Sequence, residues 1–182
     1  MNTDQTLLKS SIKLVQLLDK TADEALPEKI ADVVKLHSKL SVASAWIPVP
    51  GADVAAGAAA IWGMYIRINN KINLTLADNV MKTIGSGVAT NLAAYAVGTG
   101  VASALKFIPG IGTIGGALIM SATQYALTMA SGWIYLQALI ALAERGNGSI
   151  DTSKLGDAIK EMLKEKSVIT DFINSAKKDY KK

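Results

Sequence analysis

The stretch that decides the fold is residues 107–143, FIPGIGTIGGALIMSATQYALTMASGWIYLQALIALA, in which no side chain carries a charge. A second uncharged run, residues 83–105, precedes it, and Lys106 is the single charge between the two runs. Each run reaches the roughly 20 residues that a helix needs to cross a bilayer. Pro109 and Gly110 offer a turn between them. We therefore expect a Gly/Ala-rich helical hairpin over residues 83–143, with Lys106, Pro109 and Gly110 at its turn.

Outside this hairpin, charge is concentrated at the two ends of the chain. Residues 1–41 carry 12 charged side chains and residues 151–182 carry 14, whereas the 109 residues from 42 to 150 carry only 8. An average composition would place about 27 charges in a segment of that length. Such a segment contacts lipid, packs against other copies or a partner, or has a surface of small, nearly neutral residues. The composition leaves these three alternatives open.

The hydrophobic periodicity predicts an all-α fold, because no stretch alternates apolar and polar residues for long. We expect a single domain over residues 1–182, a bundle of about seven helices in three parts: amphipathic helices in 1–44, charge-poor helices in 45–145 and amphipathic helices in 151–179. The expected helices cover residues 4–22, 28–44, 51–73, 75–105, 111–144, 152–165 and 167–179. The apolar sides of the first two are expected to include Ile12, Leu18, Ile30, Val33, Val34, His37 and Leu40.

Two further patterns concern how the central helices begin and pack. Pro48, Pro50 and Gly51 predict a sharp helix entry, where Asp53 would cap the positive end of the helix dipole. Small residues that let helices approach closely are expected to serve packing or self-assembly. These residues are Gly98, Ala102, Gly112, Gly115 and Gly116.

The composition argues against most catalytic chemistry. The chain has no cysteine and a single histidine, so we expect no metal site and no bound cofactor. His37 lies on an apolar helix side, which is typical of a buried structural imidazole. No pairing of a nucleophile with a base stands out, and we expect no enzymatic activity. A net charge of +4 is too small to indicate a nucleic-acid partner.

Several cations are candidates for contacts with lipid headgroups. Arg67 and Lys71 lie one turn apart near the end of an expected helix, where they could instead satisfy its last carbonyls. The others form a basic tail, for which a solvated end is the alternative reading: Lys177, Lys178, Lys181 and Lys182.

Residues 106–117, KFIPGIGTIGGA, continue through 125–128, 130–132 and Tyr135 in a pattern that resembles the central signature of the domain of unknown function 697 family. Residues 47–53, IPVPGAD, resemble the helix entry of the same family, and the whole resemblance spans about residues 45–143. It implies an α-helical module of bacterial proteins, often attached to GTPase domains or associated with membranes, without established catalysis. The chain departs from a GTPase because it contains no GxxxxGK[ST] phosphate loop. The resemblance thus implies a stand-alone module or the partner of a GTPase.

Taken together, these patterns predict a non-enzymatic interaction module in the cytoplasm or on the cytoplasmic face of a membrane. Its hairpin would insert conditionally into lipid or support self-assembly. The alternative is a soluble homo-oligomeric scaffold or adaptor whose central helices are buried between subunits.

Overall fold

A computed structural model describes residues 3–43, 52–77, 79–80, 84 and 117–164. Its helices are α1 (Thr3–Ala25), α2 (Glu28–Val42), α3 (Ala52–Lys71), α6 (Ala117–Arg145) and α7 (Leu155–Lys164), with a 3-10 turn at Thr152–Lys154. These residues contain no strand, which confirms the all-α class for the described part of the chain. Most of the expected hairpin and the helix expected over 167–179 lie outside the described residues, so the count of seven helices remains a prediction.

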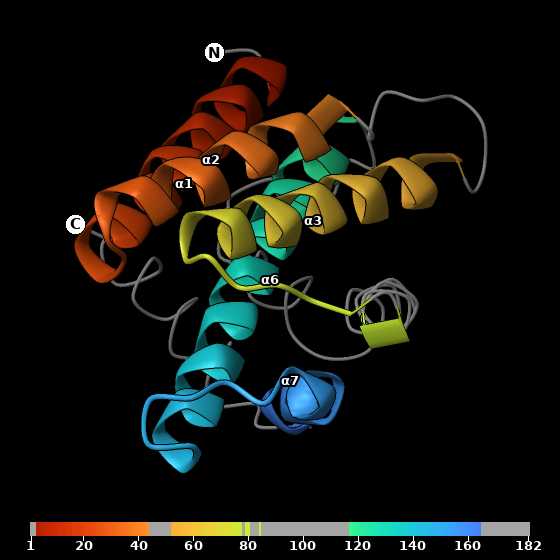
Figure 1. Cartoon of the computed structure of the whole chain (residues 1–182). Coiled ribbons are helices and arrows are strands. Elements are labelled where there is room, and N and C mark those ends of the chain that lie inside the picture. Colours follow the sequence, from red (N-terminus) through yellow and green to blue (C-terminus); the bar gives the residue numbers. More distant parts are fainter. Residues whose placement is uncertain (1–2, 44–51, 78, 81–83, 85–116, 165–182) are drawn as a thin grey trace.

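The helices form a layer of three over a central fourth. The helices α1, α2 and α3 lie side by side across one part of α6, and α7 packs against its C-terminal part (Figure 1). Of the described helices, α6 is the one that contacts all the others. The core therefore sits around α6.

The apolar composition of α6 is explained by its burial under other helices of the same chain. Within it, the segment Gln124–Arg145 is long and apolar enough to cross a membrane by length and composition, and 67% of its apolar window is buried by neighbouring helices. The amphipathic helices α1, α2 and α7 turn their apolar sides to α6 and their charges to solvent. The charged ends of the chain thus cover part of its uncharged middle.

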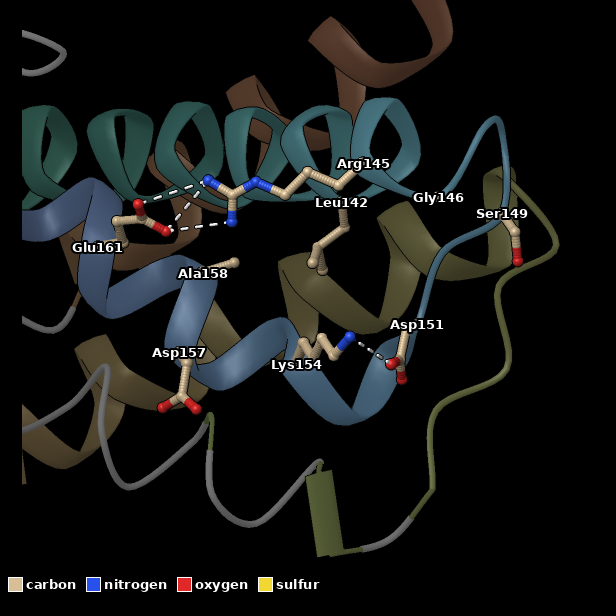
Figure 2. A pocket seen from close by; sticks show the side chains of 9 residues that line it. All are labelled: Leu142, Arg145, Gly146, Ser149, Asp151, Lys154, Asp157, Ala158 and Glu161. Atoms are coloured by element: carbon tan, nitrogen blue, oxygen red, sulfur yellow. Dashed lines mark hydrogen bonds and ion pairs between the residues drawn. The ribbon is translucent and has the colours of Figure 1, made fainter.

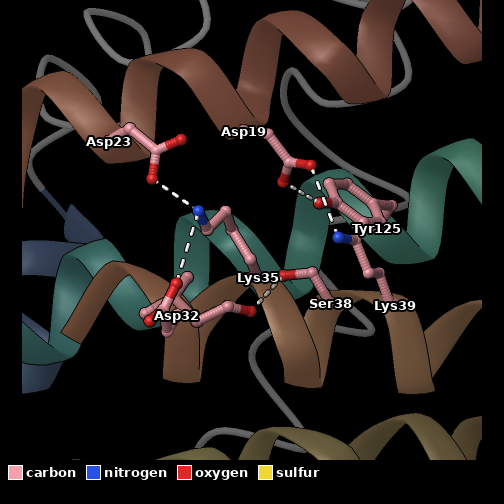
Figure 3. Close-up of polar contacts among 8 residues, drawn as sticks. Asp19, Asp23, Asp32, Lys35, Ser38, Lys39 and Tyr125 are labelled. Carbon is pink, nitrogen blue, oxygen red and sulfur yellow. Dashed lines mark hydrogen bonds and ion pairs between the residues drawn. The ribbon is translucent and has the colours of Figure 1, made fainter. Parts of the chain in front are cut away.

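Polar contacts fix α2 against α1 and α6 (Figure 3). The ammonium group of Lys35 lies 2.5 Å from Asp23 of α1, and that of Lys39 lies 3.7 Å from Asp19. The hydroxyl of Tyr125, on α6, donates a hydrogen bond to the same Asp19 carboxylate. Because these contacts join three helices, they set the register of α1 on the rest of the bundle.

Left-handed residues end α3 and α6. Asn73 has a φ of 55°, and the N–H of Leu74 donates to the carbonyl of Asn69, which closes a Schellman turn. Asn147 (φ 50°) and Gly148 (φ 90°) end α6 in the same way. The expected helix bounds are corrected accordingly. The helix α3 ends at Lys71 rather than at 73, and residues 74–77 are not helical, although the next helix was expected to begin at 75.

Two residues assigned to apolar helix sides are not buried. Ile12 is 48% exposed and Leu40 is 53% exposed. Leu18, Ile30, Val33, Val34 and His37 are buried as expected. Leu40 fails because α6 and α3 cover only the part of α2 that Val34, His37 and Ser41 occupy, and Leu40 projects beyond it.

Candidate functional site

Two predicted lipid-contacting residues are described, and both are exposed. Arg67 and Lys71 lie one turn apart at the end of α3. Neither forms an ion pair with any residue that the structure describes. They are therefore positive charges that protein carboxylates do not neutralise within the described part of the chain.

The other predicted site residues lie outside the described residues, and their assignments remain predictions. Asp53 is in the first turn of α3, but its side chain is not described. The rest are the packing residues Gly98, Ala102, Gly112, Gly115 and Gly116, the turn residues Lys106, Pro109 and Gly110, the entry residues Pro48, Pro50 and Gly51, and the tail residues Lys177, Lys178, Lys181 and Lys182.

The seam between α2 and α3 is built around His37. Its side chain is 5% exposed, and Nδ1 lies 2.8 Å from the carbonyl oxygen of Ala60 on α3. A Cβ on Gly63 would lie 2.9 Å from His37 Cε1, so the imidazole fits here because residue 63 is a glycine. The other ring nitrogen, Nε2, is buried without a hydrogen-bond partner. Burial lowers the pKa of His37, and the positive charge of Arg67 adds to this, although the hydrogen bond to the Ala60 carbonyl acts in the opposite direction.

Apolar side chains lie exposed beside this seam. Leu36 is 42% exposed and Leu40 is 53% exposed, and they are one turn apart on α2. Leu36 and Leu40 flank His37 in the sequence of α2. The His37 ring lies against Gly63 of α3, and Arg67 follows Gly63 by one helical turn. Leu36 and Leu40 of α2, with Arg67 and Lys71 of α3, are called the α2–α3 face below. It combines exposed apolar side chains with positive charge that no carboxylate of the described residues compensates.

A buried polar network joins α3 to α6, and the sequence analysis missed it. The rings of Tyr65 and Tyr135 stack with centroids 4.0 Å apart. The hydroxyl of Tyr135 donates to Asn69 Oδ1 at 2.6 Å, and that of Tyr65 donates to the carbonyl oxygen of Ser131 at 3.2 Å. Burial raises the pKa of both phenols, so both stay protonated and act as donors. The arrangement holds two helices in register rather than preparing a reactive group.

A cavity of about 390 Å³ lies between the end of α6 and α7 (Figure 2). Its charged lining residues neutralise one another: Arg145 lies 3.3 Å from Glu161, and Lys154 lies 3.4 Å from Asp151. The remaining carboxylate, Asp157, pairs with Lys160 at 3.1 Å. No lining charge is left to select a ligand. The oxygen of Asp151 that accepts from the N–H of Ser153 caps the 3-10 turn.

Among the described residues, no group of three or more His, Asp or Glu side chains is placed to hold a metal ion. No family model, curated protein or solved structure matched the chain in the three comparisons. Membership of the domain of unknown function 697 family therefore remains a prediction from the sequence motifs.

Proposed function

We propose that the chain is a non-enzymatic helical module that binds the anionic cytoplasmic face of a membrane through the α2–α3 face. The observation that carries the proposal is that α2 exposes Leu36 and Leu40 while the adjoining α3 exposes Arg67 and Lys71, two cations without a carboxylate partner among the described residues. Apolar side chains can enter the headgroup boundary while cations attract anionic lipids. The described part of α6 stays in the core, so this binding is peripheral.

The test is co-sedimentation with vesicles of phosphatidylcholine alone and of phosphatidylcholine mixed with phosphatidylserine. Each cation near an anionic surface contributes about 1 kcal/mol, so Arg67→Gln or Lys71→Gln should weaken binding to the mixed vesicles about five-fold. Lys164→Gln is the matched control, because it removes the same charge from the exposed end of α7. Leu36→Ser with Leu40→Ser should weaken binding without changing its salt dependence.

Three outcomes would overturn this proposal. One is equal binding to both kinds of vesicle, and another is an equal loss of binding in Lys164→Gln. Binding that does not weaken with added salt would also contradict it, because exposed charges are screened by salt.

The second candidate is the soluble homo-oligomeric scaffold. It is favoured by the one-turn spacing of Leu36 and Leu40, which also suits packing against a helix of a second copy. Light scattering separates the candidates: Leu36→Ser with Leu40→Ser should lower the oligomer mass in the scaffold and leave it unchanged in the membrane-binding module. The predicted GTPase partner rests on the sequence resemblance, and co-purification with a neighbouring GTPase would test it.

A further inference from the structure

His37 is seated in one protonation state. A carbonyl oxygen only accepts, so the 2.8 Å contact with Ala60 requires the hydrogen on Nδ1. Nε2 is then a bare acceptor, buried without a donor to pair with. The neutral ring leaves one acceptor unsatisfied at this seam. A protonated ring would instead leave both a buried N–H without an acceptor and an uncompensated charge, which is much costlier.

The charged groups around the ring do not favour a cation. On α3, the charge that acts on His37 is Arg67, and its sign is repulsive toward an imidazolium. The described part of α6 is uncharged until its last turn, which carries Glu144 and Arg145. On α1, the carboxylates that face α2 are engaged by its lysines: Asp23 with Lys35, and Asp19 with Lys39.

We propose that His37 is an acid-sensitive latch that holds α2 against α3 while neutral and releases the seam when Nε2 takes up a proton. The imidazole can reach water as a cation only by leaving its seat against Gly63 and Ala60. Because the ring sits between the two helices, its departure separates α2 from α3 along their contact.

The direction of the pH dependence follows from the lowered pKa of His37. The unfolded or opened chain takes up its proton near the usual pKa of about 6.5, before the closed form does. The latch is therefore fully closed above that pH and is weakened as the pH falls toward the lower pKa of the closed form. The equilibrium constant for closure falls by up to about tenfold for each pH unit in this window.

The functional consequence rests on the proposed membrane binding. Opening the seam exposes the apolar sides of α2 and α3. Leu36 and Leu40 lie at the outer edge of the apolar side of α2. Acid should then strengthen binding to vesicles that contain phosphatidylserine. The latch itself is measured without vesicles, so its failure and the failure of the proposed function are distinct results.

Because the chain has a single histidine, its imidazole proton signals in a nuclear magnetic resonance titration belong to His37 alone. The signal of the folded protein should titrate below about pH 6.5, and Arg67→Gln should move its midpoint upward. Hydrogen exchange, corrected for the intrinsic effect of pH, should show α2 and α3 losing protection between about pH 7.5 and about pH 5.5. Helix α7, which packs chiefly against α6, should keep its protection.

His37→Asn is the decisive variant, because its amide can still donate to the Ala60 carbonyl and cannot titrate. In this variant, the hydrogen-exchange protection of α2 and α3 should no longer fall with acid, while the exchange of exposed loops should be the same as in the wild type. The latch is overturned by a variant as acid-sensitive as the wild type, or by a wild-type signal that titrates at or above about pH 6.5. If His37→Asn does not fold, the titrations of the wild type and of Arg67→Gln decide the question by themselves.

Discussion

Gly132, on α6, marks the point where α2 and α3 cross the central helix. A Cβ added there would lie 3.0 and 3.1 Å from the two methyl carbons of Val34 and 3.1 Å from Met64 Sδ. Gly57, on α3, offers a matched position in another helix interior. A Cβ there would lie 3.1 Å from Gln124 Oε1, at the end of a flexible side chain that is only partly buried.

The two alanine substitutions should therefore differ in sign. Replacing glycine by alanine inside a helix stabilises it by up to about 1 kcal/mol. At Gly57 the glutamine can move aside, so most of that gain should remain. At Gly132 the buried, β-branched Val34 cannot turn away, and overpacking costs about 1–3 kcal/mol. We expect Gly57→Ala to raise the free energy of unfolding and Gly132→Ala to lower it by up to about 2 kcal/mol.

Urea unfolding followed by circular dichroism measures the free energy of unfolding of both variants. In a thermal melt, each kcal/mol corresponds to a shift of about 2–4 °C in Tm for a chain of this length. Val34→Ala should relieve the clash, so a double-mutant cycle should show Gly132→Ala costing less when Val34 is alanine. If Gly132→Ala is as stabilising as Gly57→Ala, α2 and α3 do not cross α6 at this glycine, and the packing described above is wrong.

Two hydroxyl deletions test the polar contacts of α6. Tyr135→Phe leaves the buried Asn69 amide oxygen without its donor, and we expect it to cost about 1–3 kcal/mol in urea unfolding. Tyr125→Phe should cost less, because the Asp19 carboxylate is 24% exposed and keeps its contact with Lys39; an equal or larger loss than in Tyr135→Phe would contradict this ranking.

Local patterns predicted α1, α2 and α7 well, because each of them has an apolar side that recurs with the helix period. The cap at Asp151 follows a local rule of the same kind, since aspartate before a helix accepts from the N–H two residues later. The end of α3 was not readable in the same way. Asn73 adopts a left-handed conformation that asparagine tolerates, and the sequence has no glycine at this position to indicate the end of the helix.

The contacts between helices were much harder to predict. Periodicity identifies an apolar side but not its width, so Leu40 was grouped with His37 although one is exposed and the other buried. The bond between Tyr135 and Asn69 joins residues 66 positions apart, and it depends on how α3 crosses α6. The seat of His37 depends in the same way on Gly63 of the next helix.

Burial explains the low charge of residues 124–143 without lipid. The helices α1, α2, α3 and α7 cover α6, and polar side chains on α6 form hydrogen bonds with them, such as that between the hydroxyls of Ser131 and Tyr65. Insertion of α6 into a bilayer would remove α3 and leave the polar atoms of Ser131 and Tyr135 unpaired in hydrocarbon, where each unpaired group costs several kcal/mol. Membrane contact through the outer α2–α3 face leaves those bonds intact. For the described part of the chain, docking is thus energetically easier than spanning, and the uncharged sequence of α6 is accounted for by its place in the core.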